Sequence, residues 1–239
     1  MTHETLLIVA GLEKHFTLHL HGAKRLPVVE NVGFTLHAGE CVVLGGPSGA
    51  GKSSILKMVY GNYLTNGGSV LIRHKGEMIE LTDASPRAVL EVRRETLGYV
   101  SQFLRVIPRV SALDIVAEPA RSAGLTMEAA RARAASLLAR LNLPERLWGL
   151  PPATFSGGEQ QRVNIARGFA GEHAVMILDE PTASLDATNR AAVVKLIEEK
   201  KAQGCGFLGI FHDEDVRSLV ADRIVDVTGF KPSVQGEAA

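Results

Sequence analysis

The sequence predicts an α/β fold in which a parallel β-sheet is preceded by an antiparallel β region and interrupted by a helical insert. Two short segments, Val175–Leu178 and Phe207–Phe211, contain only apolar residues and one glycine. Such runs are typical of parallel strands that are covered on both faces. Residues 103–155, in contrast, carry few strand signals and are rich in helix formers. They therefore indicate a helical subdomain inserted into the sheet region.

Strands and turns dominate the first third of the chain. We expect strands at Leu6–Ala10, Phe34–Leu36 and Cys41–Leu44 because each is a short apolar run bounded by turn residues. A hairpin should follow, in which Gly67–Arg73 pairs with Met78–Leu81. These elements predict that this part of the chain is built of strands and turns.

A histidine-rich run, Lys14–His21, lies between the first two expected strands. In a strand, His19 and His21 would share one face, a spacing that also suits a pair of metal ligands. Because no third ligand lies nearby in the sequence, an exposed polar face is the favoured interpretation. No function is assigned to His15, His19 or His21.

The remainder of the chain alternates helices with strands. Gly98–Gln102 is predicted to be a strand that ends in a polar residue, and Arg223–Val227 to be the last strand. Thr126 is suited to cap the longest helix of the insert, and Pro144 follows the end of that helix. Helices are expected at Ser54–Tyr60, Ser85–Glu95, Met127–Leu141, Gly158–Ala170, Ala187–Ala202 and Val216–Leu219.

Length and composition indicate an ordinary globular protein. The chain has 239 residues, of which 46% are hydrophobic and 22% are charged, so it can bury a large core. The formal net charge is zero and gives no support for nucleic-acid binding. Cys41 and Cys205 lie in apolar runs and predict reduced thiols in a reducing, cytoplasmic compartment. No apolar run approaches the roughly 18 residues of a spanning helix, so a membrane role would require a partner subunit.

The strongest motif is a glycine-rich loop that matches the pattern G-x-x-x-x-G-K-[ST] and is flanked by an expected strand and helix. Its glycines allow the backbone to fold around an anion, and the helix adds about half a positive charge. Lys52 should reach the β- and γ-phosphates of a nucleotide, and Ser53 should ligate Mg²⁺. The predicted phosphate-binding residues are Gly46, Pro47, Ser48, Gly49, Ala50, Gly51, Lys52, Ser53 and Ser54.

Two further groups of residues fit a nucleotide site. Asp179 ends an apolar strand and Glu180 follows it, which is the edge where parallel sheets bind ligands. Asp179 suits Mg²⁺, directly or through water, and Glu180 suits the activation of water that attacks the γ-phosphate. In Ser156–Arg162, a serine and two glycines precede a helix. This arrangement predicts either a second anion-binding helix terminus or simply a good helix cap.

The order and spacing of these motifs resemble those of the ATP-binding cassette (ABC) ATPases over essentially the whole chain. The resemblance implies an α/β fold of the ABC-type nucleotide-binding domain, with a RecA-like P-loop sheet, an antiparallel β-subdomain and a helical subdomain. It implies ATP and Mg²⁺ as cofactors. It also implies a second ABC subunit, identical or paralogous, that meets the first head to tail around two ATP molecules. Residues 1–239 would form one domain, with a core lobe at 1–101 and 156–239 and a helical lobe at 102–155.

The resemblance also implies roles for individual residues. Phe16 would stack on adenine, unless it is simply a core residue. Gln102 would sense Mg²⁺ and the attacking water, and His212 would contact the γ-phosphate, so that both would act beside the catalytic Glu180. Asp186 would join the two sites of the dimer. The residues that would cover the nucleotide bound by the opposite subunit are Ser156, Gly157, Gly158 and Glu159.

Within the ABC ATPases, the chain resembles the L subunit of the phosphonate carbon–phosphorus lyase system. The runs that carry this resemblance are Leu26–Val28, Glu91–Arg94, Ser101–Asp114, Pro144–Trp148 and Gly209–Glu214. It implies an ATPase that works with a soluble phosphonate-lyase core complex and supports formation of ribose triphosphate phosphonate. Two alternatives stay open. One is the ATPase subunit of a membrane transporter of the lipoprotein-release or macrolide-export type, and the other is a module that binds ATP without hydrolysing it.

Overall fold

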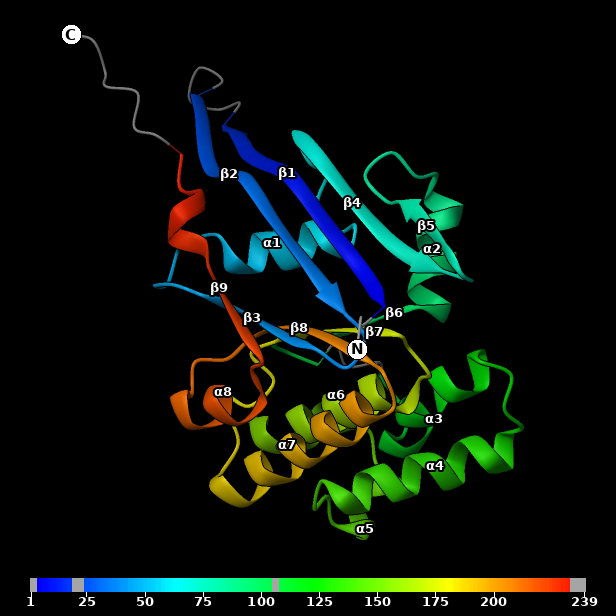
Figure 1. The fold of residues 1–239 in the computed structure, drawn as a ribbon. Coiled ribbons are helices and arrows are strands. Elements are labelled where there is room, and N and C mark those ends of the chain that lie inside the picture. Colours follow the sequence, from blue (N-terminus) through cyan, green and yellow to red (C-terminus); the bar gives the residue numbers. More distant parts are fainter. Residues whose placement is uncertain (1–3, 19–23, 105–107, 233–239) are drawn as a thin grey trace, which may run out of the picture.

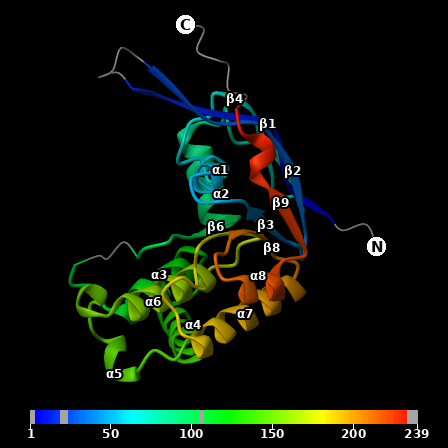
Figure 2. The ribbon, with the colours of Figure 1, turned by 90° about the vertical axis from the view of Figure 1, so that its left-hand side faces the viewer.

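The computed structural model describes residues 4–18, 24–104 and 108–232, and its elements are stacked in two layers. An antiparallel sheet lies above a parallel sheet, and most of the helices lie beneath the parallel sheet (Figures 1 and 2). The predicted fold class, a mixed α/β fold with a parallel P-loop sheet and an antiparallel sheet, is confirmed.

The antiparallel sheet has four strands in the order β2-β1-β4-β5. Its first two strands are longer than the sequence predicts, because bulges interrupt their alternating pattern at Val9–Leu12 and Leu12–Lys14. The strand therefore continues through His15, whereas His19 and His21 lie outside the described residues. The four strands are β1 (Thr5–Leu18), β2 (Lys24–His37), β4 (Gly67–His74) and β5 (Glu77–Glu80).

The parallel sheet has five strands in the order β6-β7-β8-β3-β9. All four of its strand pairs are parallel, so the carboxyl ends of the strands lie along one edge. That edge carries the sequence motifs, because the phosphate loop follows β3 and Glu180 follows β7. The strands are β3 (Cys41–Gly45), β6 (Leu97–Val100), β7 (Val175–Asp179), β8 (Gly206–Ile210) and β9 (Arg223–Asp226).

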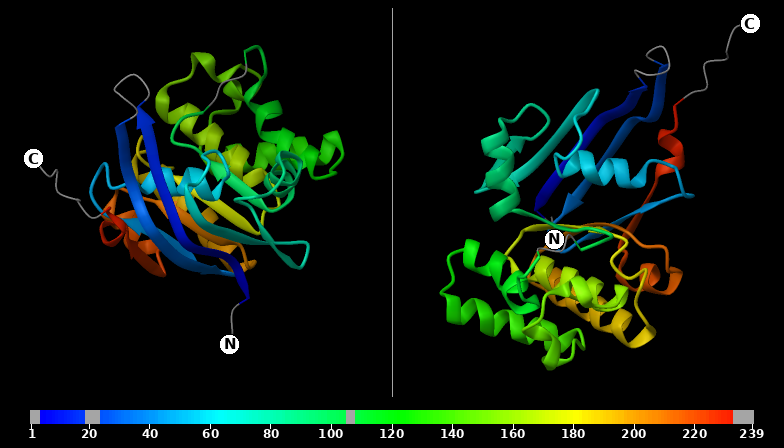
Figure 3. Two further views of the ribbon diagram at one scale, coloured as in Figure 1. Left: turned by 90° about the horizontal axis from the view of Figure 1, so that it is seen from above. Right: turned by 180° about the vertical axis from the view of Figure 1, so that it is seen from behind.

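Helix α1 (Lys52–Val59) lies between the two sheets, as the view from behind shows (Figure 3). Its Ile55 and Leu56 are fully buried in a core that also contains Leu7 of β1 and Leu208 of β8. Burial of each such side chain is worth about 2 kcal/mol. This packing fixes the helix that begins at the phosphate loop. Helix α2 (Pro86–Glu95), capped by the Ser85 side chain, leads into β6.

A second core lies under the parallel sheet and continues into the helical insert. Phe169 on α6 stacks on Phe207 of β8 with ring centroids 6.1 Å apart. The same cluster includes Val116 and Leu138 of the insert, so the insert shares its core with the sheet. The helices of this layer are α3 (Ala112–Ser122), α4 (Met127–Arg140), α5 (Glu145–Trp148), α6 (Gly157–Ala170), α7 (Ala187–Ala202) and α8 (Glu214–Val220). Two short 3₁₀ helices are η2 (Pro152–Thr154) and η3 (Val227–Phe230).

Both cysteines are buried and free, as predicted. Cys41 lies in β3, whereas Cys205 lies just before β8 rather than in a strand. Burial raises the pKa of each thiol to about 12, so both remain protonated and unreactive at neutral pH. Among the helices in the described ranges, none has the length and apolar character needed to cross a bilayer.

Gly68 supports a tight contact between β4 and the bulge in β1. Its φ is +79°, and a Cβ there would lie 2.2 Å from the carbonyl oxygen of Gly11. We expect Gly68→Ala to lower the free energy of unfolding by at least about 2 kcal/mol, because alanine disfavours this backbone conformation and its Cβ would clash with Gly11. Gly149→Ala is the control, since a Cβ there meets nothing within 4 Å. Urea denaturation of both variants tests this, and equal stabilities would contradict it.

Candidate functional site

The glycine-rich loop turns sharply between β3 and α1. Gly46, Gly49 and Gly51 have φ values of +126°, +78° and +94°, which favour glycine. At Gly51 there is a second reason, because a Cβ would come within 2.6 Å of Val29 Cγ1 in β2. The loop therefore adopts a conformation that brings backbone N–H groups and the start of α1 to the carboxyl edge of the sheet.

Lys52 is the first residue of α1 and is only 8% exposed. Its Nζ donates hydrogen bonds to the carbonyl oxygens of Gly46 (2.7 Å) and Pro47 (2.8 Å). The ammonium group is thus held inside the curve of the loop. A cation together with a helix N-terminus at one point makes a strong site for a phosphate group.

Asp179, the last residue of β7, is 5% exposed and both of its carboxylate oxygens accept hydrogen bonds. Oδ1 accepts from Ser53 Oγ at 3.3 Å, and Oδ2 accepts from the Tyr99 hydroxyl at 2.8 Å. Oxygen donors from a carboxylate and a hydroxyl are the ligands that Mg²⁺ prefers. The structure therefore brings together the predicted residues Ser53 and Asp179 in a form that suits a magnesium site.

Tyr99 is a residue of this site that the sequence analysis missed. It lies on β6 beside β7, and its ring packs on that of Tyr60 with centroids 4.7 Å apart. Burial and the neighbouring Asp179 carboxylate raise the pKa of its hydroxyl, which therefore stays protonated and can donate. The available signal was a tyrosine inside an otherwise apolar strand, although its partner depends on strand register.

Glu180 follows β7 and has the left-handed backbone conformation, with φ +53°. For a residue other than glycine, this conformation costs about 1 kcal/mol. Its amide donates to the carbonyl oxygen of Ile210 at 3.1 Å, which ties the turn to β8. The side chain meets two other predicted catalytic residues: Oε1 lies 2.9 Å from His212 Nε2, and Oε2 accepts from Gln102 Nε2 at 3.4 Å. Three strand ends thus contribute to one cluster.

The glycine turn at the start of α6 is a capped helix terminus that faces solvent. The Ser156 hydroxyl accepts from the Glu159 amide, and the Glu159 carboxylate accepts from the Ser156 amide at 2.8 Å. The Ser156 hydroxyl also donates to the Glu159 carboxylate at 2.8 Å, and this bond, together with the one from the Ser156 amide, lowers the pKa of the Glu159 carboxyl. A Cβ on Gly157 would meet nothing within 4 Å, whereas one on Gly158 would lie 3.1 Å from the Ser184 carbonyl oxygen. The packing of this chain therefore explains Gly158 but leaves Gly157 free to face another molecule.

Within the described ranges, no hydrogen bond joins Ser156, Gly157 or Glu159 to the phosphate loop. The structure accordingly does not bring the two glycine motifs together in one chain. Other residues, on the buried face of α6, connect this helix to the turns that carry Gln102 and Glu180. The sequence analysis missed these residues as well.

Two buried amides link α6 to the catalytic turns. Asn164 donates from Nδ2 to the Ser101 carbonyl oxygen at 2.5 Å, and Gln161 donates from Nε2 to the Pro181 carbonyl oxygen at 3.0 Å. Ser101 precedes Gln102, and Pro181 follows Glu180. These two bonds therefore tie α6 to both turns. The sequence signal for these bonds was the presence of polar residues at positions of the helix that should be buried, because buried polar groups are hydrogen-bonded.

Asp186 caps α7, as its carboxylate accepts from the backbone amide of Asn189 at 2.8 Å. This bond lowers the pKa of the Asp186 carboxyl. Asn189 also accepts from Asn142 Nδ2 at 3.0 Å, which connects the Asp186 turn to the end of α4 in the helical insert.

Phe16 lies on β1 and is 39% exposed, which is more than a core position would allow. Its ring packs edge-on against Tyr63, with centroids 5.7 Å apart, and Lys14 Nζ lies 4.9 Å from its centroid. The face of the ring is thus partly available for stacking.

Proteins of similar sequence are ATP-binding components of bacterial membrane systems. The chain is 37% identical over 223 residues to the lipoprotein-releasing system ATP-binding protein LolD 2 of Caulobacter vibrioides, which covers 93% of this chain and 94% of that protein. It is 34% identical over 224 residues to the macrolide export ATP-binding/permease protein MacB 1 of Aeromonas hydrophila. The chain spans about one third of the length of MacB 1 and of the other export ATP-binding/permease relatives it matches.

The fold also matches that of solved structures. The ATP-binding cassette MJ0796, determined as a dimer in a post-hydrolysis state bound to ADP and Pi, superposes with a TM-score of 0.84 at 26% identity. The match covers 97% of this chain and 100% of that one. A dimer of two cassettes is thus a form that this fold adopts, and it supports the predicted second ABC subunit.

The predicted place in the phosphonate carbon–phosphorus lyase system is wrong. The relatives are lipoprotein-release and export proteins, so the soluble phosphonate-lyase core complex and the formation of ribose triphosphate phosphonate are discarded. The physical reason lies in the runs on which that prediction depended. They include surface residues such as Leu26 and Phe103, which are 40% and 73% exposed and are weakly constrained by the fold.

The family itself is shown by the extent of the match. The sequence model described as ABC transporter matches residues 29–183, which include the phosphate loop, the α6 glycine turn and the Asp179–Glu180 pair. The lipoprotein-release relative extends the match to nearly the whole chain. The chain therefore belongs to the ABC transporter family, of which it forms the ATP-binding ATPase domain.

Proposed function

We propose that this chain is the ATP-hydrolysing subunit of a bacterial membrane transporter of the lipoprotein-release or macrolide-export type. The observation that carries the proposal is the match to LolD 2, because it extends over 93% of this chain and 94% of that protein. The export relatives add the same cassette joined to a permease within one chain. In this role the chain would work on the cytoplasmic side with a separate membrane-spanning partner.

The nucleotide would bind at the carboxyl edge of the parallel sheet. Backbone amides of residues 48–53 would donate to the phosphates, and Lys52 would turn from its loop carbonyls toward the β- and γ-phosphates. Ser53, Asp179 and Gln102 would hold Mg²⁺ with oxygen ligands, some through water. When bound, the ion would supply positive charge that neutralises the phosphates. Phe16 would stack on the adenine ring.

Hydrolysis would use the cluster beyond β7. The Glu180 carboxylate would accept a proton from the attacking water, and Gln102 would help to position that water. His212, already 2.9 Å from Glu180, would donate from its ring toward the γ-phosphate. Each of these residues is held at a strand end, so the cluster is pre-organised by the sheet.

The second half of the site would come from a second cassette. Ser156, Gly157 and Glu159 would approach the γ-phosphate bound by the partner, which fits the open space around Gly157. Asp186 would contact the partner across the interface. ATP would then stabilise the dimer by mass action, since it binds the closed pair, and hydrolysis would release it.

The membrane partner would contact the surface that begins at Phe103. This ring is 73% exposed and follows Gln102 directly, so a partner there would be coupled to the state of the site. Aromatic side chains are enriched at protein interfaces, and this one lies directly after a residue of the proposed site.

Glu180→Gln should reduce ATP turnover by about 100-fold or more, because an amide cannot accept the proton from water. The variant should still bind ATP, and size-exclusion chromatography with ATP and Mg²⁺ should show a stable dimer. Glu128→Gln on exposed α4 is the control and should behave as the wild type. If the wild type itself shows no turnover and Glu180→Gln changes neither turnover nor dimer formation, the chain is an ATP-binding module; if an active wild type and the variant turn over equally, Glu180 is not the base.

Tyr99→Phe should raise the Mg²⁺ concentration needed for half-maximal ATPase activity and for tight binding of a non-hydrolysable ATP analogue by about 10-fold. The reason is the loss of a hydrogen bond to a carboxylate, worth about 1.5–3 kcal/mol. Binding of nucleotide without Mg²⁺ should not change. Tyr60→Phe removes the neighbouring phenol and serves as the control. If both variants show the wild-type Mg²⁺ dependence, Tyr99 does not position Asp179.

Phe103→Glu should release the chain from the membrane fraction of cells, because a charge would replace the aromatic ring at the partner surface. Detergent extraction followed by affinity purification should recover an integral membrane protein with the wild type but not with this variant. Leu64→Glu is the control, since Leu64 is 83% exposed and lies far along the chain from the helical insert. Recovery of soluble proteins alone with the wild type would contradict the transporter role.

A further inference from the structure

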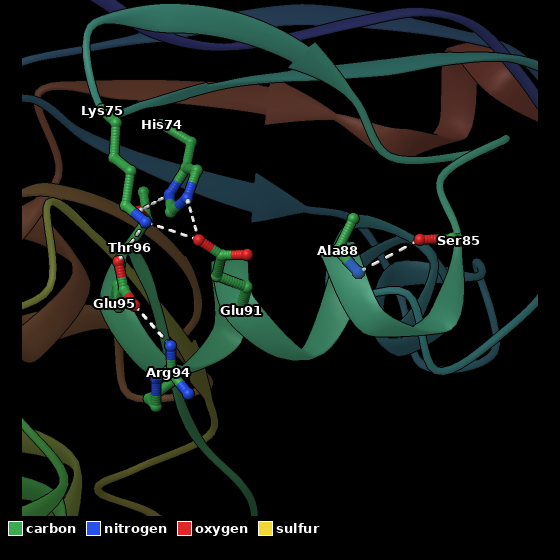
Figure 4. A network of polar contacts seen from close by, with 8 residues as sticks. All are labelled: His74, Lys75, Ser85, Ala88, Glu91, Arg94, Glu95 and Thr96. Atoms are coloured by element: carbon green, nitrogen blue, oxygen red, sulfur yellow. Dashed lines mark hydrogen bonds and ion pairs between the residues drawn. The ribbon is translucent and has the colours of Figure 1, made fainter.

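A cluster of charged and imidazole groups joins the antiparallel sheet to α2, and none of its residues belongs to the nucleotide site (Figure 4). His74 is the last residue of β4, and Glu91 and Glu95 lie one turn apart on α2. One ligand atom from each of these three residues lies within 4.8 Å of the other two. Both supporting elements are regular and packed, so the three groups are held in a fixed arrangement.

The unusual member of the cluster is His74, which is 5% exposed. Its Nδ1 lies 2.6 Å from Thr96 Oγ1, in a bond that orients the ring. Its Nε2 is buried and has no hydrogen-bond partner among the described residues. This nitrogen faces Glu91 Oε1 at 3.7 Å. A buried polar atom without a partner is costly, and this one points at a carboxylate.

The unfavourable contact between His74 Nε2 and Glu91 depends on which ring nitrogen of His74 carries the proton. When Nδ1–H donates to Thr96, Nε2 carries a lone pair that faces the oxygen of Glu91. Two electron-rich atoms that face each other across a short gap repel, and in this tautomer a cation between or beside them would remove the repulsion. The Thr96 hydroxyl thus has the role of the outer-shell partner that commonly orients a metal-binding histidine.

The contacts of Lys75 show that the two carboxylates attract a positive charge to this position. Its Nζ lies 2.5 Å from Glu91 Oε1 and 3.0 Å from Glu95 Oε2. The Lys75 side chain is 58% exposed, so it can swing into solvent at little cost. An ammonium group, however, has only hydrogen-bond donors to offer and must compete with Nε2–H in the other tautomer. A metal ion would satisfy the Nε2 lone pair and both carboxylates together.

We propose that His74, Glu91 and Glu95 form a binding site for a divalent transition-metal ion of the Zn²⁺ class, which Lys75 closes when the ion is absent. Ligand atoms around a tetrahedral zinc ion are about 3.3 Å apart, given bonds of about 2.0 Å. The His74–Glu91 separation of 3.7 Å is close to this value. Imidazole nitrogen and carboxylate oxygen are both ligands that zinc accepts in proteins.

Water can supply the fourth ligand from the adjoining cavity. A cavity of ≈ 360 Å³ is lined by His74, Lys75, Glu91 and the surrounding residues of β5 and α2. It connects the cluster to solvent, so it also provides a path for entry of the ion. Bound there, the ion would fix α2 against the end of β4.

The test uses the purified full chain, stripped of metal and free of nucleotide, titrated with Co²⁺ as a spectroscopic probe. The wild type should show one equivalent of tetrahedral Co²⁺ with visible d–d bands, and Zn²⁺ should displace it. Lys75→Ala should bind about 10-fold more tightly, because the competing ammonium is gone. Lys195→Ala, an exposed lysine on α7, is the control and should match the wild type.

Removal of the ligands should abolish the signal. Glu91→Gln/Glu95→Gln changes two partly exposed residues and should retain the fold, whereas His74→Gln tests the buried nitrogen directly. Glu77→Gln, which lines the same cavity, should keep the wild-type spectrum. The proposal is overturned if neither the wild type nor Lys75→Ala gives tetrahedral bands. It is also overturned if the bands survive in the double glutamine variant, since the ion would then be bound elsewhere.

Discussion

Parallel pairing of β7 with its neighbours is the constraint on which the nucleotide site depends. Because β6, β7 and β8 run in the same direction, the residues that follow them meet at one edge although they are far apart in sequence. Gln102, Glu180 and His212 come together in this way. A slip of one residue in any pair would turn the side chains to the opposite face. The antiparallel sheet and α1 fill the other side and prevent such a slip.

The phosphate loop could be predicted from the sequence because all of its groups are contiguous. Its glycines, Lys52 and Ser53 need only a strand before them and a helix after them. The bond from Tyr99 to Asp179 could not be predicted, because it requires the register of two strands separated by the whole helical insert. The same holds for Asn164 and Gln161, whose acceptors are backbone carbonyls that carry no sequence signal.

The phosphonate-lyase system was predicted wrongly from sequence for a related physical reason. Residues that hold the nucleotide are fixed by chemistry that ABC ATPases share, so they do not separate one system from another. Partner choice would depend instead on exposed side chains such as Phe103, which this chain's own packing does not determine. The fold can therefore be predicted from the residues that pack in the interior, whereas the partner has to be inferred from proteins of similar sequence.

The two buried amides on α6 offer a physical route by which one cassette of the proposed dimer would act on the other. Ser156 and Gly157 stand at the start of this helix, where a partner's nucleotide would contact them. Gln161 and Asn164, on the next turns, hold the backbone beside Glu180 and Gln102. A shift of α6 caused at its terminus would therefore reach both catalytic turns of its own chain through two hydrogen bonds. Because α6 also shares its core with the helical insert, the same shift would move the surface at Phe103. Helix α6 would in this way couple the nucleotide and the dimer partner to the membrane partner.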